Sequence, residues 1–220
     1  IKGNKRIKLI NNTNDIFFVK YDSTGMEKWA KSFGGSGWVD IVYSLTSDKS
    51  GNIYLAGTFD SPTISFGGIT LNNSGSYDIF LTKYDTAGNA LWAKNPNGSG
   101  IDYSFSVTHD LSGNVYLAGY FRSPTISFGS YSLNNSGNTD VFIAKYNSSG
   151  AELWAKGVGG SQNDIANSVA TDSKGNVYLT GIFSSPSISF GNTTLTNGGT
   201  QDLFLACLSS KYGIISGTLF

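Results

Sequence analysis

One phrase recurs four times along this chain of 220 residues and constrains its fold more than any other feature. The copies begin at Asp15, Asp78, Asp140 and Asp202, so successive starts lie 63, 62 and 62 residues apart, and the first copy reads Asp-Ile-Phe-Phe-Val-Lys-Tyr. A fixed period of this length indicates supersecondary units that bury their apolar faces only against one another. The chain is therefore predicted to be an array of structural repeats.

The repeat that begins at Asp40 predicts four antiparallel strands, over residues 41–46, 53–59, 79–84 and 90–94. Turn residues at 47–52 and 85–89 join the strands in pairs, and the long connection 60–77 holds a small hairpin over 64–71 that bends at Gly67-Gly68. Both faces of the third strand are apolar, which is typical of a sheet packed between two neighbours. Such four-stranded units of about 62 residues predict an all-β fold, a β-propeller or an arc of one.

The repeats fill one domain, residues 1–220, with a partial blade at 1–33 and blades at 40–95, 102–157 and 164–220. Roughly three and a half to four blades are visible, and the last one carries Gly217 where the others have tryptophan. An open arc leaves a strand edge and an apolar blade face in water. We expect upstream sequence, a strand at residues 5–10 or a second copy of the chain to cover them.

Three phrases of the form Lys-Tyr-(Asp/Asn)-x-x-Gly-x-x-x-Trp, at 20–29, 83–92 and 145–154, carry a family resemblance. With the downstream Gly-Asn-(Ile/Val)-Tyr-Leu, they resemble bacterial SBBP-type β-propeller repeats. The Asp-x-x-Gly-x-x-x-Trp core is similar to the tryptophan-docking motif of quinoprotein propellers. The resemblance implies a propeller fold and little about function, because such repeats occur mostly in surface or secreted bacterial proteins of undefined role.

Composition excludes several classes of protein. The 15 basic and 15 acidic side chains cancel, which argues against nucleic acid and anionic lipid as partners. No stretch approaches the ~18 apolar residues of a membrane span. A lone Cys207 and a lone His109, which is expected to be exposed, argue against disulfides and against metal or cofactor sites. Few cysteines and abundant Asn, Ser and Thr favour an extracellular or bacterial cell-surface location.

Two sets of recurring residues are interpreted as structural. Trp29, Trp92 and Trp154 recur once per repeat, which favours packing between blades over three separate sugar platforms. The aspartates that precede the first turn of each blade are expected to cap that turn. A calcium site is the alternative for them, but the spacing of an EF-hand loop is not there. These aspartates are Asp48, Asp110 and Asp172.

Long loops between second and third strands, and between blades, are expected to share one face, where ligand binding is most common. Candidate ligand-binding residues on it are those where the copies differ or where loop aromatics occur: Trp38, Asp60, Tyr77, Arg122 and Tyr131. Aligned with Gly100 and Gln162, Trp38 is either an exposed anchor or a lid over the cleft between blades.

These residues favour a non-catalytic binding and assembly scaffold with a protein or glycan ligand, or a homo-oligomer that completes the propeller or a filament. A carbohydrate-binding, lectin-like propeller is the alternative. A fragment of a quinone-dependent dehydrogenase is a weaker one, because that enzyme needs charged residues converging at the centre of a larger propeller, and the chain has only Arg6 and Arg122.

Overall fold

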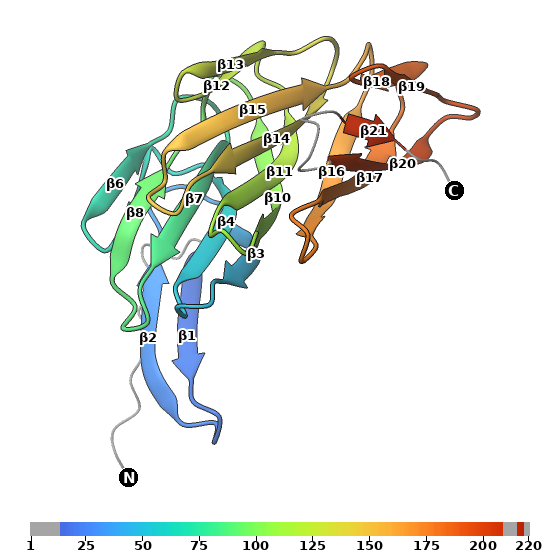
Figure 1. Ribbon diagram of the computed structural model, residues 1–220. Coiled ribbons are helices and arrows are strands. Elements are labelled where there is room, and N and C mark those ends of the chain that lie inside the picture. Colours follow the sequence, from blue (N-terminus) through green and yellow to red (C-terminus); the bar gives the residue numbers. More distant parts are fainter. Residues whose placement is uncertain (1–13, 209–214, 218–220) are drawn as a thin grey trace.

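The computed structural model describes residues 14–208 and 215–217, which fold into antiparallel β-sheets and turns, with no helix in these ranges. A hairpin of β1 (Ile16–Tyr21) and β2 (Glu27–Phe33) precedes three four-stranded sheets. Figure 1 shows the sheets following one another in chain order, from the blue hairpin to the third sheet in orange and red. The described residues form no closed ring.

Each four-stranded sheet is built from strands in the order first, second, third and fourth. The first sheet holds β3 (Asp40–Ser47), β4 (Ile53–Phe59), β7 (Asp78–Tyr84) and β8 (Ala90–Lys94). The second holds β10 (Asp102–His109), β11 (Val115–Phe121), β14 (Asp140–Tyr146) and β15 (Glu152–Val158). The third holds β16 (Asp164–Thr171), β17 (Val177–Phe183), β20 (Asp202–Leu208) and β21 (Ile215–Gly217).

A small hairpin follows the second strand of every four-stranded sheet. The hairpins are β5 (Thr63–Phe66) with β6 (Ile69–Asn72), β12 (Thr125–Phe128) with β13 (Tyr131–Asn134), and β18 (Ser187–Phe190) with β19 (Thr193–Thr196). The two-residue strand β9 (Asn97–Gly98) pairs with β12. The hairpin expected at 64–71 is thus confirmed, and its bend uses positive φ angles of 60° at Gly67 and 97° at Gly68, which glycine adopts without strain.

The core consists of three apolar clusters, and each cluster joins two consecutive sheets. In the third strand of the first sheet, Ile79 and Leu81 pack toward the second sheet, whereas Phe80 and Tyr84 pack toward the β1–β2 hairpin. All four side chains are fully buried. This double burial is the physical reason for the two apolar faces seen in the sequence.

The two ends of the array expose the residue types that are buried between sheets. Phe17 is 71% exposed, although its counterpart Phe80 is fully buried. At the other end Leu203, the counterpart of Ile79, is 75% exposed. The covering strand expected at residues 5–10 lies outside the described residues.

The register of the last strand corrects one expectation. Lys145 pairs with Trp154 in the second sheet, and the residue equivalent to Lys145 in the third sheet, Cys207, pairs with Ser216. Ser216, not Gly217, therefore occupies the register position of the repeated tryptophan, because the spacing from Cys207 to Ser216 equals that from Lys145 to Trp154.

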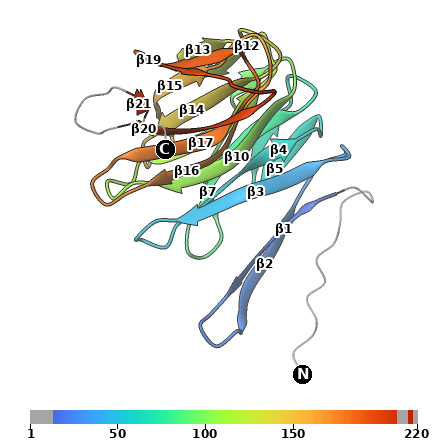
Figure 2. The same cartoon turned by 90° about the vertical axis from the view of Figure 1, so that its right-hand side faces the viewer.

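First strands of neighbouring sheets lie side by side, as Figure 2 shows for β3, β10 and β16. The backbone N–H of Val107 donates to Ser44 Oγ at 3.1 Å, and that of Val169 donates to Ser106 Oγ at 3.1 Å. Each first strand also has a β-bulge at its third to fifth residue, between Ser104 and Ser106 in β10 for example. These inner strands, with their bulges, position the candidate site described next.

Candidate functional site

Five aromatic side chains converge where the first and second sheets meet, and we call them the tyrosine cluster: Tyr43, Tyr77, Tyr103, Phe105 and Tyr120. Tyr103 lies at the centre, stacked on Tyr120 at 5.3 Å between ring centroids and on Tyr77 at 5.6 Å. Phe105 contacts Tyr103 at 5.9 Å, Tyr120 at 5.6 Å and Tyr43 at 5.1 Å. Ring separations of this size are those of favourable aromatic pairs.

Two strand bulges and one cross-strand pair position four of the five rings. Tyr43 and Phe105 are the bulged residues of β3 and β10, and a bulge turns its side chain away from the regular face of the strand. Tyr103 pairs directly with Tyr120 across β10 and β11. The third sheet carries Ile165, Asn167 and Ile182 at the positions of Tyr103, Phe105 and Tyr120. The cluster therefore belongs to one joint, by which we mean the junction between two consecutive sheets, here the first and the second.

The cluster is partly open to solvent, since Tyr43 is 40% exposed and the other four rings are half-buried. Burial raises the pKa of Tyr103 to about 12, with neighbouring tyrosines and Asp60 adding to the shift. Burial also raises the pKa of Tyr43 and of Tyr120, the latter against the opposing charge of Arg122. These three hydroxyls therefore stay protonated at neutral pH and can donate hydrogen bonds to a ligand.

Two of the predicted ligand-binding residues flank the cluster. Asp60 lies near enough to act on Tyr103, and its Oδ1 accepts the Val39 N–H at 2.8 Å, which ties the loop before β3 to the end of β4. Arg122 is an exposed residue whose positive charge lies near enough to Tyr120 to oppose the rise of its pKa. The structure thus brings Asp60, Tyr77 and Arg122 to one site.

Trp38 is 80% exposed, so it does not cover the cleft between sheets, and the lid interpretation is wrong. The structure also shows that Gly37, and not Trp38, is the counterpart of Gly100. The N–H groups of Gly37, Gly100 and Gln162 each donate to the serine Oγ that follows the second strand of the next sheet, at 2.8 to 2.9 Å. Val39 then forms the parallel bridge that the residue after Gly100 forms in the next joint. Trp38 is therefore an extra residue, pushed outward by a loop one residue longer than its counterparts.

Tyr131 does not join the tyrosine cluster. It starts β13 and packs, half-buried, against the apolar cluster between the first and second sheets. Conversely, Tyr43, Tyr103, Phe105 and Tyr120 were not predicted as site residues. Comparing the repeats along the inner strands, rather than along the loops, would have singled them out.

The repeated tryptophans dock onto the next sheet. Trp29 Nε1 and Lys20 Nζ both donate to the Thr86 carbonyl, at 3.2 and 3.0 Å. Trp92 Nε1 and Lys83 Nζ donate in the same way to the Ser148 carbonyl, at 3.2 and 2.9 Å. A glycine of the receiving turn lies under each ring, so that a Cβ on Gly88 would come within 2.9 Å of Trp29 and one on Gly150 within 2.9 Å of Trp92. The contribution of these contacts to stability stays a prediction.

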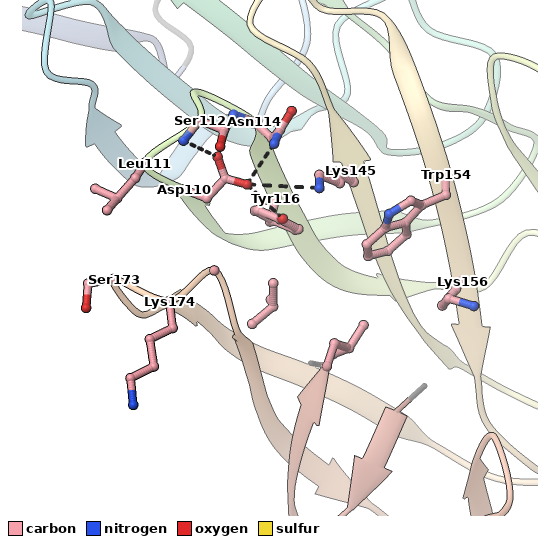
Figure 3. A pocket seen from close by; sticks show the side chains of 13 residues that line it. Asp110, Leu111, Ser112, Asn114, Tyr116, Lys145, Trp154, Lys156, Ser173 and Lys174 are labelled. Atoms are coloured by element: carbon pink, nitrogen blue, oxygen red, sulfur yellow. Dashed lines mark hydrogen bonds and ion pairs between the residues drawn. The ribbon is translucent and has the colours of Figure 1, made fainter. Parts of the chain in front are cut away.

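The third Lys–Trp pair, Lys145 and Trp154, faces a pocket of about 600 Å³ between the second and third sheets. Figure 3 shows Lys145 beside Asp110, at 4.0 Å, with Lys156 and Lys174 also lining the pocket. The turn of the third sheet that corresponds to the docked turns lies outside the described residues. We therefore assign no ligand to this pocket.

Asp110 and its counterparts Asp48 and Asp172 each hold their own turn. Oδ1 of Asp110 accepts the N–H groups of Ser112 and Asn114, both at 2.9 Å. Oδ2 accepts Asn114 Nδ2 at 2.7 Å and the Tyr116 hydroxyl at 3.0 Å. Burial opposes ionisation, but the bonds from Asn114 and Tyr116 and the charge of Lys145 outweigh it and lower the pKa of Asp110. The pKa of Asp48 and of Asp172 is lowered as well.

A second set of aspartates begins the first and third strands at the long-loop end, and these side chains are buried. Asp102 Oδ1 accepts the N–H groups of Arg122 and Ser123 at 3.0 and 3.1 Å, and its Oδ2 accepts the Ser123 hydroxyl at 2.6 Å. Burial nevertheless dominates and raises the pKa of Asp102, as it does for Asp40, Asp78 and Asp140. These carboxyls hold the loops at this end of the sheets.

His109 is half-buried, not exposed, because its Nδ1 lies 3.0 Å from the Thr46 hydroxyl of the neighbouring first strand. Within the part of the chain that the structure describes, no three His, Cys, Asp or Glu side chains gather as a metal site would require. That the chain needs no cofactor stays a prediction. No helix in the described ranges is long and apolar enough to span a membrane.

The aligned joints, the docked tryptophans and the repeated turns form a pattern that comparison with known families can test. Residues 153–181 match the model of the SBBP β-propeller repeat. The match runs from β15 to β17 and supports the repeat family that the sequence resembles. The fold is accordingly all-β and antiparallel, with a propeller repeat.

Two curated relatives extend the comparison. An uncharacterized WD repeat-containing protein of Acanthamoeba polyphaga mimivirus is 27% identical over 216 residues, covering 84% of this chain and 15% of that protein. The regulatory protein FlaEY of Caulobacter vibrioides is 30% identical over 155 residues, covering 66% of this chain and 16% of that protein. The chain spans a small part of both relatives, and one of them is viral, so the bacterial origin implied by the resemblance is not shown.

Proposed function

We propose that this chain is a non-catalytic scaffold, secreted or on the cell surface, and that the tyrosine cluster is its contact surface for a segment of a partner protein. One observation carries the proposal: five aromatic rings gather at one joint, whereas the next joint has Ile165, Asn167 and Ile182 at the equivalent positions. A propeller repeat and a WD repeat-containing relative support an interaction scaffold in general.

The chemistry of the cluster suits a peptide ligand. Tyrosine, tryptophan and arginine supply most of the energy at protein interfaces, since they offer large apolar area together with hydrogen bonds. Here the half-buried rings are rigidly packed against one another, which keeps the entropic cost of binding low. Asp60 and Arg122 add one charge of each sign beside the rings, which would orient a bound segment.

Carbohydrate binding is the second candidate, and one observation favours it. Tyr103 is stacked with both Tyr77 and Tyr120, whereas Trp38 is 80% exposed and leaves its indole available for a sugar. The two candidates therefore rely on different residues, which makes them separable.

The test is a selection of displayed peptides on the wild-type chain, followed by affinity measurements on two variants. Tyr103→Ile with Phe105→Asn installs the residues of the third sheet, and Trp38→Gly serves as the matched control. Loss of one or two interface anchors should weaken peptide binding at least about tenfold. The double variant loses the ring contacts of Tyr103 and Phe105, so its melting temperature is expected to fall, and binding is measured well below that temperature.

Peptides that bind both forms of the cluster equally would contradict the proposal. A glycan array on the same proteins separates the alternative, since a glycan retained by the wild type and lost by Trp38→Gly would support the carbohydrate-binding function instead. An absorption scan that finds a bound quinone would contradict the non-catalytic assignment.

A further inference from the structure

A second, polar pocket lies on the long-loop face between the second and third sheets, away from the tyrosine cluster. Its volume is about 460 Å³. Serines of β13 and β18, the buried Asp140, and two glycines at the end of β15, Gly157 and Gly159, line it. Few apolar atoms are available there, so a ligand must be recognised by hydrogen bonds.

The preceding joint shows what fills this space elsewhere in the same chain. Gly157 lies three residues after Trp154, and the residue three positions after Trp92 in the preceding joint is Asn95. The side-chain Nδ2 of Asn95 donates to the Asn72 carbonyl at 2.6 Å and lies 3.4 Å from Asp78 Oδ2. Asn95 thus provides a primary carboxamide to the aspartate that begins β7.

Asp140 is the counterpart of Asp78, and it receives no such group from the described residues. Its side chain is 2% exposed. Oδ2 of Asp140 accepts the Ser136 N–H at 2.8 Å, as Oδ2 of Asp78 accepts the Ser74 N–H at 2.7 Å. No residue of 14–208 adds the contact that Asn95 Nδ2 makes with Asp78 Oδ2, and Oδ1 is without a hydrogen-bond partner in both aspartates. A buried carboxyl gains from each added N–H donor, so a ligand that restores the missing contact to Oδ2 of Asp140 gains binding energy.

We propose that this pocket binds a primary carboxamide, the side chain of Asn or Gln on a bound protein segment. The NH₂ group would face Asp140 and the carbonyl of Asn134, as Asn95 faces Asp78 and the carbonyl of Asn72. The amide oxygen would accept from the serine hydroxyls of the pocket. A carboxylate has no N–H donor for Asp140 or for the Asn134 carbonyl. An ammonium group could donate to Asp140 and to the serine oxygens, so the experiment includes methylammonium as the competing ligand.

The test uses acetamide as the probe on the complete chain, with backbone amide signals followed by NMR. Acetamide should produce saturable shifts at Ser136 and Gly159 of the wild type. Gly157→Asn should abolish them, because it fills the pocket as Asn95 does, whereas Gly157→Ala should retain them. The substitution fits, since a Cβ on Gly157 meets its nearest neighbour, Leu133, at 3.7 Å. N,N-dimethylacetamide, which has no N–H donor, should produce no saturable shift.

A second readout is independent of probe affinity. Gly157→Asn supplies the carboxamide within the chain, so its melting temperature should exceed that of Gly157→Ala. Equal melting temperatures, or shifts that grow linearly with acetamide and are the same in Gly157→Asn, would overturn the assignment. Saturable shifts with methylammonium at the same signals would also overturn it, in favour of a cation site.

Discussion

Truncating Trp92 tests how the sheets are held together. The side chain is half-buried, packs over Gly150 and beside Tyr54, and donates through Nε1 to the Ser148 carbonyl of the next sheet at 3.2 Å. Removing a fully buried tryptophan costs about 3–5 kcal/mol, so partial burial reduces the expected loss for Trp92→Ala to about 2–3 kcal/mol. For a chain of this length, that is a fall of roughly 4–12 °C in melting temperature.

Two further variants separate the contribution of the Nε1–H donor from that of ring packing and provide a control. Trp92→Phe retains most of the ring packing and removes the N–H donor, for an expected cost of about 1 kcal/mol. Leu91→Ala changes the neighbouring residue, which is 50% exposed, and should cost within about 0.5 kcal/mol. The measurement is chemical denaturation followed by circular dichroism. A Trp92→Ala cost no larger than that of Leu91→Ala would refute the docking argument.

Three other expectations follow from the geometry of the turns, the buried carboxyls and the ends of the array. Gly88→Ala should be more destabilising than Gly25→Ala in the same melts: both glycines have a φ of 81°, but a Cβ meets Trp29 at Gly88 and nothing within 4 Å at Gly25, so equal losses would exclude the ring contact. Burial raises the pKa of Asp78, so the stability that this group contributes is complete below its ordinary pKa of 3.8 and is lost as the pH rises through the folded value. Asp78→Asn should flatten that part of the pH dependence of the melting temperature, and an unchanged slope would contradict the assignment. Light scattering should show self-association through the exposed ends of this 23.4 kDa chain, weakened by Phe17→Asp or Leu203→Asp, whereas a monomeric wild type would rule out completion by a second copy.

Much of the fold could be predicted from the sequence because it depends on local periodicity. The strands at 53–59 and 90–94 begin and end in the structure where the apolar pattern begins and ends. The tight turns follow from Asp and Gly at fixed offsets, since Oδ1 of a side chain such as that of Asp110 accepts the N–H groups of its own turn. The two apolar faces of the third strand indicated sheets on both sides before any contact was known.

Most of the candidate site depends on distances that no local pattern encodes. Tyr43, Tyr77 and Tyr103 come from different strands and loops, and they meet because two bulged first strands pack side by side. Trp38 was paired with the wrong residue because sequence spacing cannot tell which loop residue is extra, whereas the hydrogen bond of Gly37 does. The open space beside Asp140 likewise exists only because Gly157 lies where the joint before it has the side chain of Asn95. Repetition in the sequence thus determined the sheets and turns of this protein, and packing between non-identical repeats decided where its surface departs from the pattern.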